Sequence, residues 1–136
     1  ILQSGVAVAA TPAGKAPCSL STVHGTYPAV AQGIEIGGST PGPFAYASRA
    51  TYEGNGGVSN GIYSGNFAGT VLRNQTFVGT YTVNADCTGT ETDNVGGGAY
   101  DHFDLIIAPD GSLIEYAGTD AQYVQSLTGT RVSGGD

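Results

Sequence analysis

The sequence contains no methionine or tryptophan and few basic residues: four lysines and arginines stand against eleven aspartates and glutamates. The net charge of −7 provides no basic surface that could follow a phosphate backbone, so we expect no nucleic-acid partner. It also disfavours binding to an anionic membrane surface. No apolar run approaches the roughly 20 residues of a spanning helix, so we expect no membrane partner.

Cysteine is also scarce, and the two residues present, Cys18 and Cys87, show no C-x-x-C or C-x-x-H spacing. This argues against structural zinc, and we expect no metal site. The two cysteines form either one disulfide or two free buried thiols, and we favour the disulfide. The low charge and the glycosylation sequon at Asn74-Gln75-Thr76 fit a secreted protein, so we predict secretion and a glycan on Asn74.

Helix signals are nearly absent from Cys18 onward, because glycine or proline interrupts almost every apolar stripe of helical period. Short alternating runs between turn signals indicate strands instead. The predicted strands are Val23–Ile36, Phe44–Glu53, Val58–Tyr63, Phe67–Arg73, Phe77–Asn84, Thr90–Thr92, Ala99–Ala108, Leu113–Gly118 and Tyr123–Val132.

This spacing predicts an all-β fold, a single small antiparallel β-barrel of about eight strands with meander topology. The alternative is a β-sandwich. Residues 1–17 lack a strong period and are predicted to form an N-terminal arm, whereas residues 18–136 form the barrel domain.

Aromatic residues alternate along these strands, so that in Phe44–Glu53 the side chains of Phe44, Tyr46 and Tyr52 share one face. Such rings either fill a core or line a pocket for an apolar ligand, with tyrosine hydroxyls as polar handles. The candidate wall residues are Phe44, Tyr46, Tyr52, Phe77, Tyr81, Phe103 and Tyr116.

Only a small number of polar residues are candidates for a catalytic role. Arg49 lies on the strand face opposite Phe44: an interior position would require a partner or a polar ligand group, and an exterior one would allow weak pairing with Glu53. His102 shares a strand face with Asp104, which predicts either a proton-transfer pair or a solvated face. The dispersed acids Glu35, Glu53, Glu91 and Glu115 give a hydrolase only weak support.

Three segments, residues 52–59, 79–89 and 103–112, together with Cys18-Ser19-Leu20, resemble a group of small secreted fungal proteins. The resemblance spans Cys18 to Arg131. The group is similar in architecture to allene oxide cyclase-like and dirigent-like barrels, and some such fungal proteins are hetero-Diels–Alderases of tropolone–sesquiterpenoid biosynthesis. The resemblance therefore implies a cofactor-independent cyclase that joins an o-quinone methide to an apolar alkene.

In such a reaction, hydrogen bonds would stabilise the developing phenolate oxygen. Arg49, His102 and Tyr81 are the candidate catalytic donors, and no cofactor is expected. The alternatives are a non-catalytic secreted barrel that binds a small apolar ligand, and a structural or host-interaction protein with a filled barrel. A cavity inside the barrel would argue against the last of these.

The strand Ala99–Ala108 is apolar on both faces, with Tyr100 and Ile106 opposite Phe103. A barrel exterior does not require apolar side chains, so we expect a second subunit or the N-terminal arm to cover this strand. The sequence therefore predicts a homodimer or another small homo-oligomer.

Overall fold

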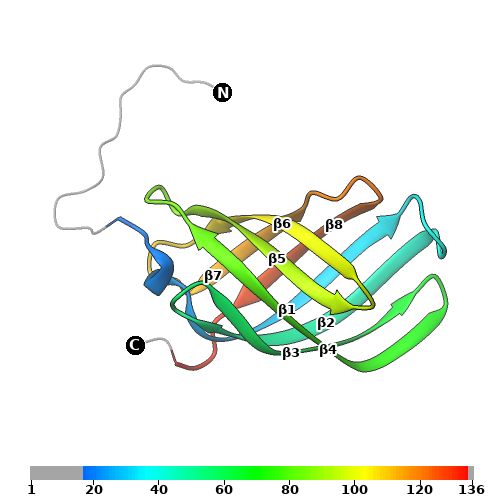
Figure 1. Ribbon diagram of the computed structural model, residues 1–136, viewed down its shortest axis with the longest axis horizontal. Helices are drawn as coiled ribbons and strands as arrows, with labels where there is room; N and C mark the ends of the chain where they lie inside the picture. Colours follow the sequence, from blue (N-terminus) through cyan, green and yellow to red (C-terminus); the bar gives the residue numbers. More distant parts are fainter. Residues whose placement is uncertain (1–16, 135–136) are drawn as a thin grey trace, which may run out of the picture.

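The computed structural model describes residues 17–134, which form a closed barrel of eight antiparallel strands (Figure 1). Each strand pairs with the next along the chain, and the last pairs with the first. The strands are β1 (His24–Glu35), β2 (Gly42–Glu53), β3 (Gly57–Phe67), β4 (Thr70–Val83), β5 (Thr88–Gly96), β6 (Ala99–Ile107), β7 (Leu113–Gly118) and β8 (Tyr123–Thr130). The predicted meander barrel is confirmed, and the sandwich alternative is wrong.

Two predicted boundaries are wrong in the middle of the chain. The expected strands Phe67–Arg73 and Phe77–Asn84 are replaced by a turn at Ala68 and Gly69, followed by one long strand, β4. Both turn residues have positive φ angles, 54° and 99°, and the chain reverses there without an asparagine–glycine or proline signal. The short predicted strand Thr90–Thr92 is the centre of β5.

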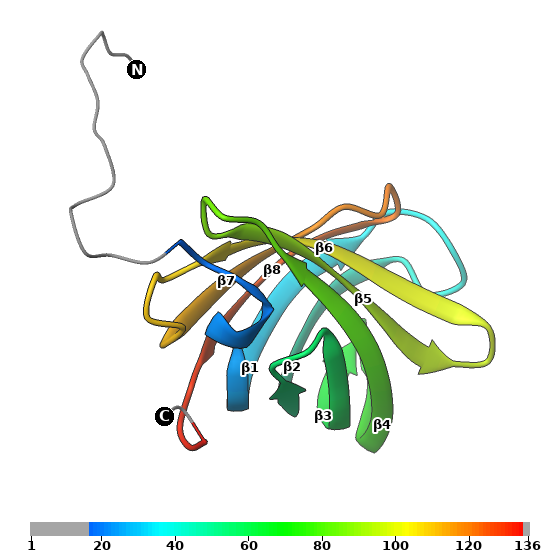
Figure 2. The same ribbon diagram turned by 60° about the vertical axis from the view of Figure 1, so that its left-hand side comes forward.

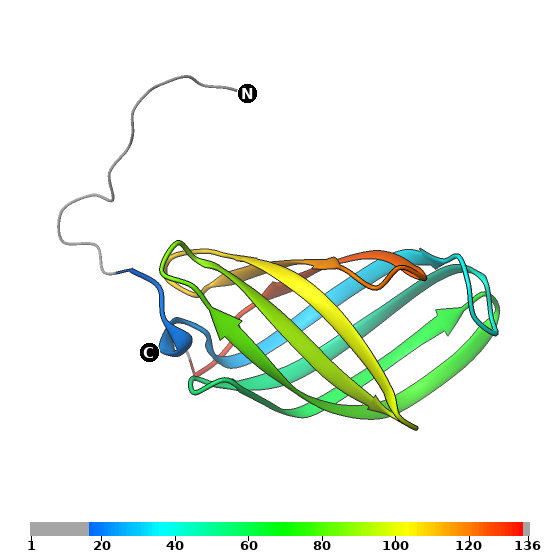
Figure 3. The ribbon, with the colours of Figure 1, turned by 45° about the horizontal axis from the view of Figure 1, so that its top comes forward.

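One end of the barrel is filled and cross-linked. The short 3-10 helix η1 (Leu20–Thr22) lies at this end, beside the β2–β3, β4–β5 and β6–β7 turns (Figures 1 and 3). A disulfide joins Cys18 to Cys87 with 5.1 Å between their Cα atoms, so the predicted pairing is confirmed. The Tyr81 hydroxyl binds the Val23 carbonyl at 2.7 Å, and Val23 is fully buried.

The barrel wall is incompletely paired towards the other end. β4 pairs with β5 only from Val78 to Val83, which leaves residues 70–77 without a strand partner on that side among residues 17–134. β6 likewise pairs with β7 only from Phe103 onward. The β5–β6 hairpin and the first half of β4 therefore diverge, as Figure 2 shows.

The predicted N-terminal arm lies outside the described residues, except for Pro17. Asn74 is exposed on β4, where its backbone N–H donates to Ser64 Oγ at 2.8 Å. A glycan there stays a prediction. Within residues 17–134 no helix is long and apolar enough to cross a membrane.

Candidate functional site

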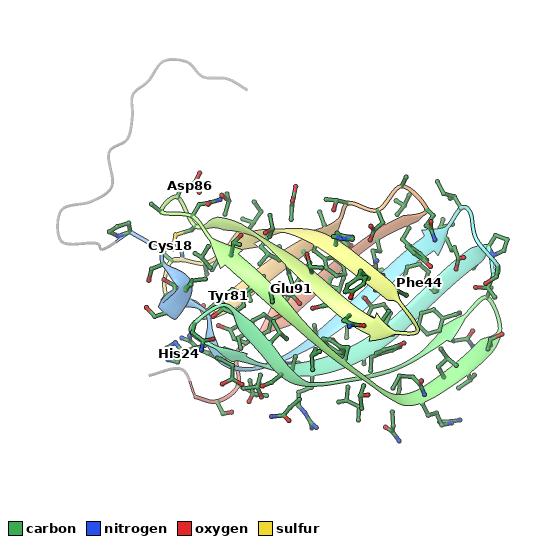
Figure 4. The ribbon with its side chains drawn as sticks, viewed as in Figure 1. Cys18, His24, Phe44, Tyr81, Asp86 and Glu91 are labelled. Carbon is green, nitrogen blue, oxygen red and sulfur yellow. A yellow bond between two sulfur atoms is a disulfide. The ribbon has the colours of Figure 1, made fainter. Side chains whose placement is uncertain are left out.

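A cavity of about 440 Å³ occupies the barrel interior towards the end opposite η1. Figure 4 shows Tyr81 near η1, Glu91 near the middle of the barrel, and Phe44 towards the far end. Six predicted wall residues surround the cavity: Phe44, Tyr46, Tyr52, Phe77, Phe103 and Tyr116. The barrel is therefore hollow in this half.

Further rings that the sequence did not single out complete the wall. Phe67 stacks on Phe44 and on Tyr46, with ring centroids 5.7 and 5.9 Å apart. The ring centroids of Tyr63 and Phe77 lie 6.2 Å apart, and Tyr123 packs edge-on against Phe44. Tyr63 and Phe67 were missed because each lay at the end of a predicted strand, where inward alternation is least certain.

A hydrogen-bonded cluster forms the inner end of the cavity. The Tyr52 hydroxyl donates to Glu91 Oε1 at 2.7 Å, and the Tyr116 hydroxyl lies 2.7 Å from that of Tyr52. Glu91 is only 3% exposed. Burial raises the pKa of its carboxyl, and hydrogen bonding to the neighbouring Asp93 carboxyl and from Tyr52 acts in the opposite direction.

Asp93 lies two residues beyond Glu91 on the same inward face of β5 and is 8% exposed. Its Oδ1 atom has no hydrogen-bond partner among the residues that the structure describes. Burial, followed by the negative charge of Glu91, raises the Asp93 pKa to about 10. Asp93 is therefore a neutral carboxylic acid at neutral pH, which reduces the cost of burying an oxygen without a partner.

Gly79 provides the space for this carboxyl. It is the direct β4 partner of Asp93, and a β-carbon at Gly79 would overlap both Asp93 Oδ1 and the Thr92 carbonyl oxygen. A glycine is needed here for close approach rather than for an unusual backbone angle.

Three more carboxyl groups line the cavity: Glu35, Asp101 and Asp120. Burial and the charge of Asp120 raise the Asp101 pKa to about 6, and His102 acts in the opposite direction. Thr40 Oγ1 donates to Glu35 at 3.0 Å, and the Tyr46 hydroxyl donates to Gln125 Oε1 at 3.2 Å. No lysine, arginine or histidine among residues 17–134 lines this cavity.

The three predicted catalytic donors lie elsewhere. Arg49 is exposed on the outer face of β2, because the alternation that turns Ala50 inward turns its neighbour outward. His102 is exposed on β6, where Nδ1 contacts Asp120 at 2.8 Å rather than Asp104. Tyr81 lies at the filled end of the barrel, where its hydroxyl group hydrogen-bonds to the backbone carbonyls of Leu20 and Val23. None of the three lines the cavity.

Sequence reasoning also missed Asp93 and Asp101 as site residues. In β5 the inward residues Gly89, Glu91 and Asp93 alternate with threonines at positions 88, 90 and 92. Strict alternation was the available signal, but a face carrying carboxyl groups is ordinarily the solvated one.

The described chain offers no group of three or more histidine, cysteine, aspartate or glutamate side chains arranged for a metal ion. Comparisons with protein-family models, curated proteins and solved structures find no match. The function must therefore be argued from the chemistry of the cavity.

Proposed function

We propose that the protein is a cofactor-independent cyclase, a hetero-Diels–Alderase that joins an o-quinone methide to an apolar alkene such as a sesquiterpene. The observation that carries this proposal is the buried Asp93 carboxyl, whose Oδ1 has no hydrogen-bond partner among residues 17–134, in the wall of an aromatic-lined cavity of about 440 Å³. This volume lies within the range of sites for small organic ligands, roughly 300–1,000 Å³.

The reaction requires no group to be added or removed. The heterodiene and the alkene form one carbon–carbon and one carbon–oxygen bond from their own π electrons, and no proton is gained or lost. The diene oxygen gains negative charge in the transition state, where a hydrogen bond lowers the barrier. We assign this donor role to the protonated Asp93 carboxyl, in place of Arg49, His102 and Tyr81.

The remaining wall residues would position the substrates and exclude water. Aromatic rings from β2, β3 and β4 provide flat apolar surfaces against which a quinone methide and a polyene can stack. Excluding water protects the electrophile from hydration. The Tyr116–Tyr52–Glu91 cluster forms the rigid inner end of this surface. Its two hydroxyl groups already donate hydrogen bonds within the cluster.

The second candidate is a carrier that binds a small apolar ligand in the same cavity without turnover. It is favoured by the same aromatic wall and requires no role for Asp93. We also propose that the protein is secreted, since a disulfide fits an oxidising compartment. Homodimer formation through β6 is proposed from the exposed side chains of Tyr100 (53%) and Ile106 (62%).

The test is to incubate the purified protein with an o-quinone methide precursor and a humulene-type alkene, and to read product stereochemistry by chiral chromatography. We expect one enantiomer, formed faster than background. Asp93→Ala should reduce the rate about tenfold or more, because alanine has no donor for a hydrogen bond to the developing charge. Arg49→Gln is the control and should keep full activity.

A racemate formed at the background rate by the unmodified protein would overturn the cyclase proposal. Native mass spectrometry on the same sample would then show whether a small molecule is bound. Full activity in the Asp93→Ala variant would overturn the role assigned to Asp93.

A further inference from the structure

Asp93 and Asp101 are direct cross-strand partners in the β5–β6 pair, and both side chains line the cavity. Two like charges directly opposite one another destabilise a sheet. Such a pair is retained at low cost only when a proton or another positive charge lies close to it. Asp93 meets this condition by holding a proton.

The cavity as a whole is also lined by acidic rather than basic side chains. Five carboxyl groups line it, and the described residues place no basic side chain among them; the five are Glu35, Glu91, Asp93, Asp101 and Asp120. A fatty acid or another anionic ligand would find no positive partner here. An ammonium group would find several carboxylates.

Two independent features point to a ligand with a positively charged donor. The Asp93 side chain is more than nine-tenths buried, and its Oδ1 lacks a hydrogen-bond partner within the described part of the chain. The surrounding wall is aromatic, and cations bind favourably over the faces of tyrosine and phenylalanine rings.

We propose that the cavity binds hydrophobic amines, with the protonated nitrogen held by Asp93 and Asp101 and the apolar body packed against the aromatic wall. This inference does not depend on the cyclase activity. It names a ligand class for the barrel, whether the barrel catalyses a reaction or only carries a molecule.

Binding would displace one proton. Asp93 holds a proton at neutral pH, and an ammonium ion arrives carrying its own charge. The Asp93 O–H bond then breaks, the proton goes to the buffer, and the resulting carboxylate pairs with the ammonium ion. The groups that face Asp93 are Glu91 on β5, Asp101 on β6, and Tyr46, Tyr52 and Tyr116 from β2 and β7. Asp101 in turn is affected by Asp120 and His102.

The experiment is isothermal titration calorimetry of the full chain with three probes of similar shape: naphthylethylamine, naphthylethanol and naphthylacetate. We expect the amine to bind about tenfold more tightly than the alcohol, equivalent to about 1.4 kcal/mol, and the acetate not to bind. Titrations in buffers of different ionisation enthalpy should show release of about one proton per amine bound and none for the alcohol.

Asp93→Asn should abolish both the proton release and the preference for the amine, while binding of naphthylethanol is retained. Asp104→Asn is the matched control, because it makes the same substitution on the exposed outer face of β6. If the Asp93 variant does not fold, Asp101→Asn is used, and it should weaken the amine but not the alcohol.

Equal affinity for amine and alcohol would overturn the inference. So would amine binding that releases no proton, since Asp93 would then not be the group that pairs with the ammonium ion. Amine binding that weakens equally in Asp104→Asn would also overturn it, since that result places the amine on the acidic exterior. Failure of the cyclase assay would leave the amine titration unaffected, so the two proposals fail separately.

Discussion

The hydroxyl groups of Tyr52 and Tyr116 lie 2.7 Å apart inside the barrel, one from β2 and the other from β7. Tyr52 has one hydroxyl proton and donates it to Glu91, so Tyr116 must be the donor in the pair. The resulting chain runs from Tyr116 through Tyr52 to Glu91. It satisfies one buried carboxyl and leaves the next, Asp93, without a donor at Oδ1 from the described residues.

Removing the Tyr52 hydroxyl should destabilise the protein. Tyr52→Phe leaves both Glu91 and the Tyr116 hydroxyl buried without this partner, and an unsatisfied buried polar group costs about 1–3 kcal/mol. Urea unfolding followed by circular dichroism measures the loss. Tyr63→Phe is the control, since it deletes a hydroxyl from the cavity wall outside this cluster. Equal stabilities for the two variants would contradict the assigned role.

Stability should fall as pH rises, because of Asp93. Its pKa is about 10 in the folded protein against 3.8 as the reference value, so the folded state binds more protons between those limits. The free energy of unfolding therefore decreases with rising pH in that window, by up to about 1.4 kcal/mol per pH unit for one group. Below pH 3.8, the reference pKa, the contribution of Asp93 to the free energy of unfolding is fully present.

Asp93→Asn should remove that part of the pH dependence, so the variant gains stability relative to the unmodified protein as pH increases from 5 to 9. The measurement is urea unfolding at several pH values in this range. Asp104→Asn, on the exposed face of β6, should retain the slope of the unmodified protein. Parallel curves for the Asp93 variant and the unmodified protein would show that Asp93 is ionised in the folded state.

Gly79→Ala should disturb the barrel where β4 faces Asp93. The added methyl group meets the Asp93 carboxyl and the Thr92 carbonyl, and overpacking of this kind costs about 1–3 kcal/mol. Gly37→Ala is the control, because its nearest neighbour would be 3.6 Å away. Chemical denaturation of both variants gives the comparison, and a Gly79 variant as stable as the control would refute the steric argument.

Loss of the disulfide should destabilise the filled end but not the cavity. The bond joins residues separated by 69 positions, so the Cys18→Ala/Cys87→Ala double variant should lose roughly 4 kcal/mol by chain-entropy arguments. Binding of naphthylethanol to the folded variant should be unchanged, because neither cysteine lines the cavity. Weaker binding at a temperature where the variant is fully folded would show that the two ends are coupled.

The sequence predicted the barrel because its turn and strand signals are local. The run Gly54-Asn55-Gly56-Gly57 forms the β2–β3 connection where expected, and Pro109-Asp110-Gly111 lies between β6 and β7. The turn at Ala68 and Gly69 was missed because alanine rarely adopts the left-handed conformation that it has here. Tertiary pairing between β3 and β4 imposes this turn.

The site was predictable only in its apolar part. Aromatic alternation identified Phe44, Tyr46 and Tyr52 on one face, and the barrel turns that face inward. The acidic part depends on the closed sheet, since only closure places the Glu91 and Asp93 face of β5 inside. For Arg49, the sequence left both faces open, and the structure places it outside.

Closure of the barrel by β1 and β8 also governs how this chain can fold. Residues from Ala29 to Glu35 pair with residues from Gly129 back to Tyr123, so nearly the whole length of the chain separates the two halves of the seam. Contacts of such sequence separation slow folding, because the entropy of a long loop is lost before the pairing is gained. Until β8 has been synthesised, β1 presents an open strand edge, and the nascent protein is most exposed to aggregation in that interval.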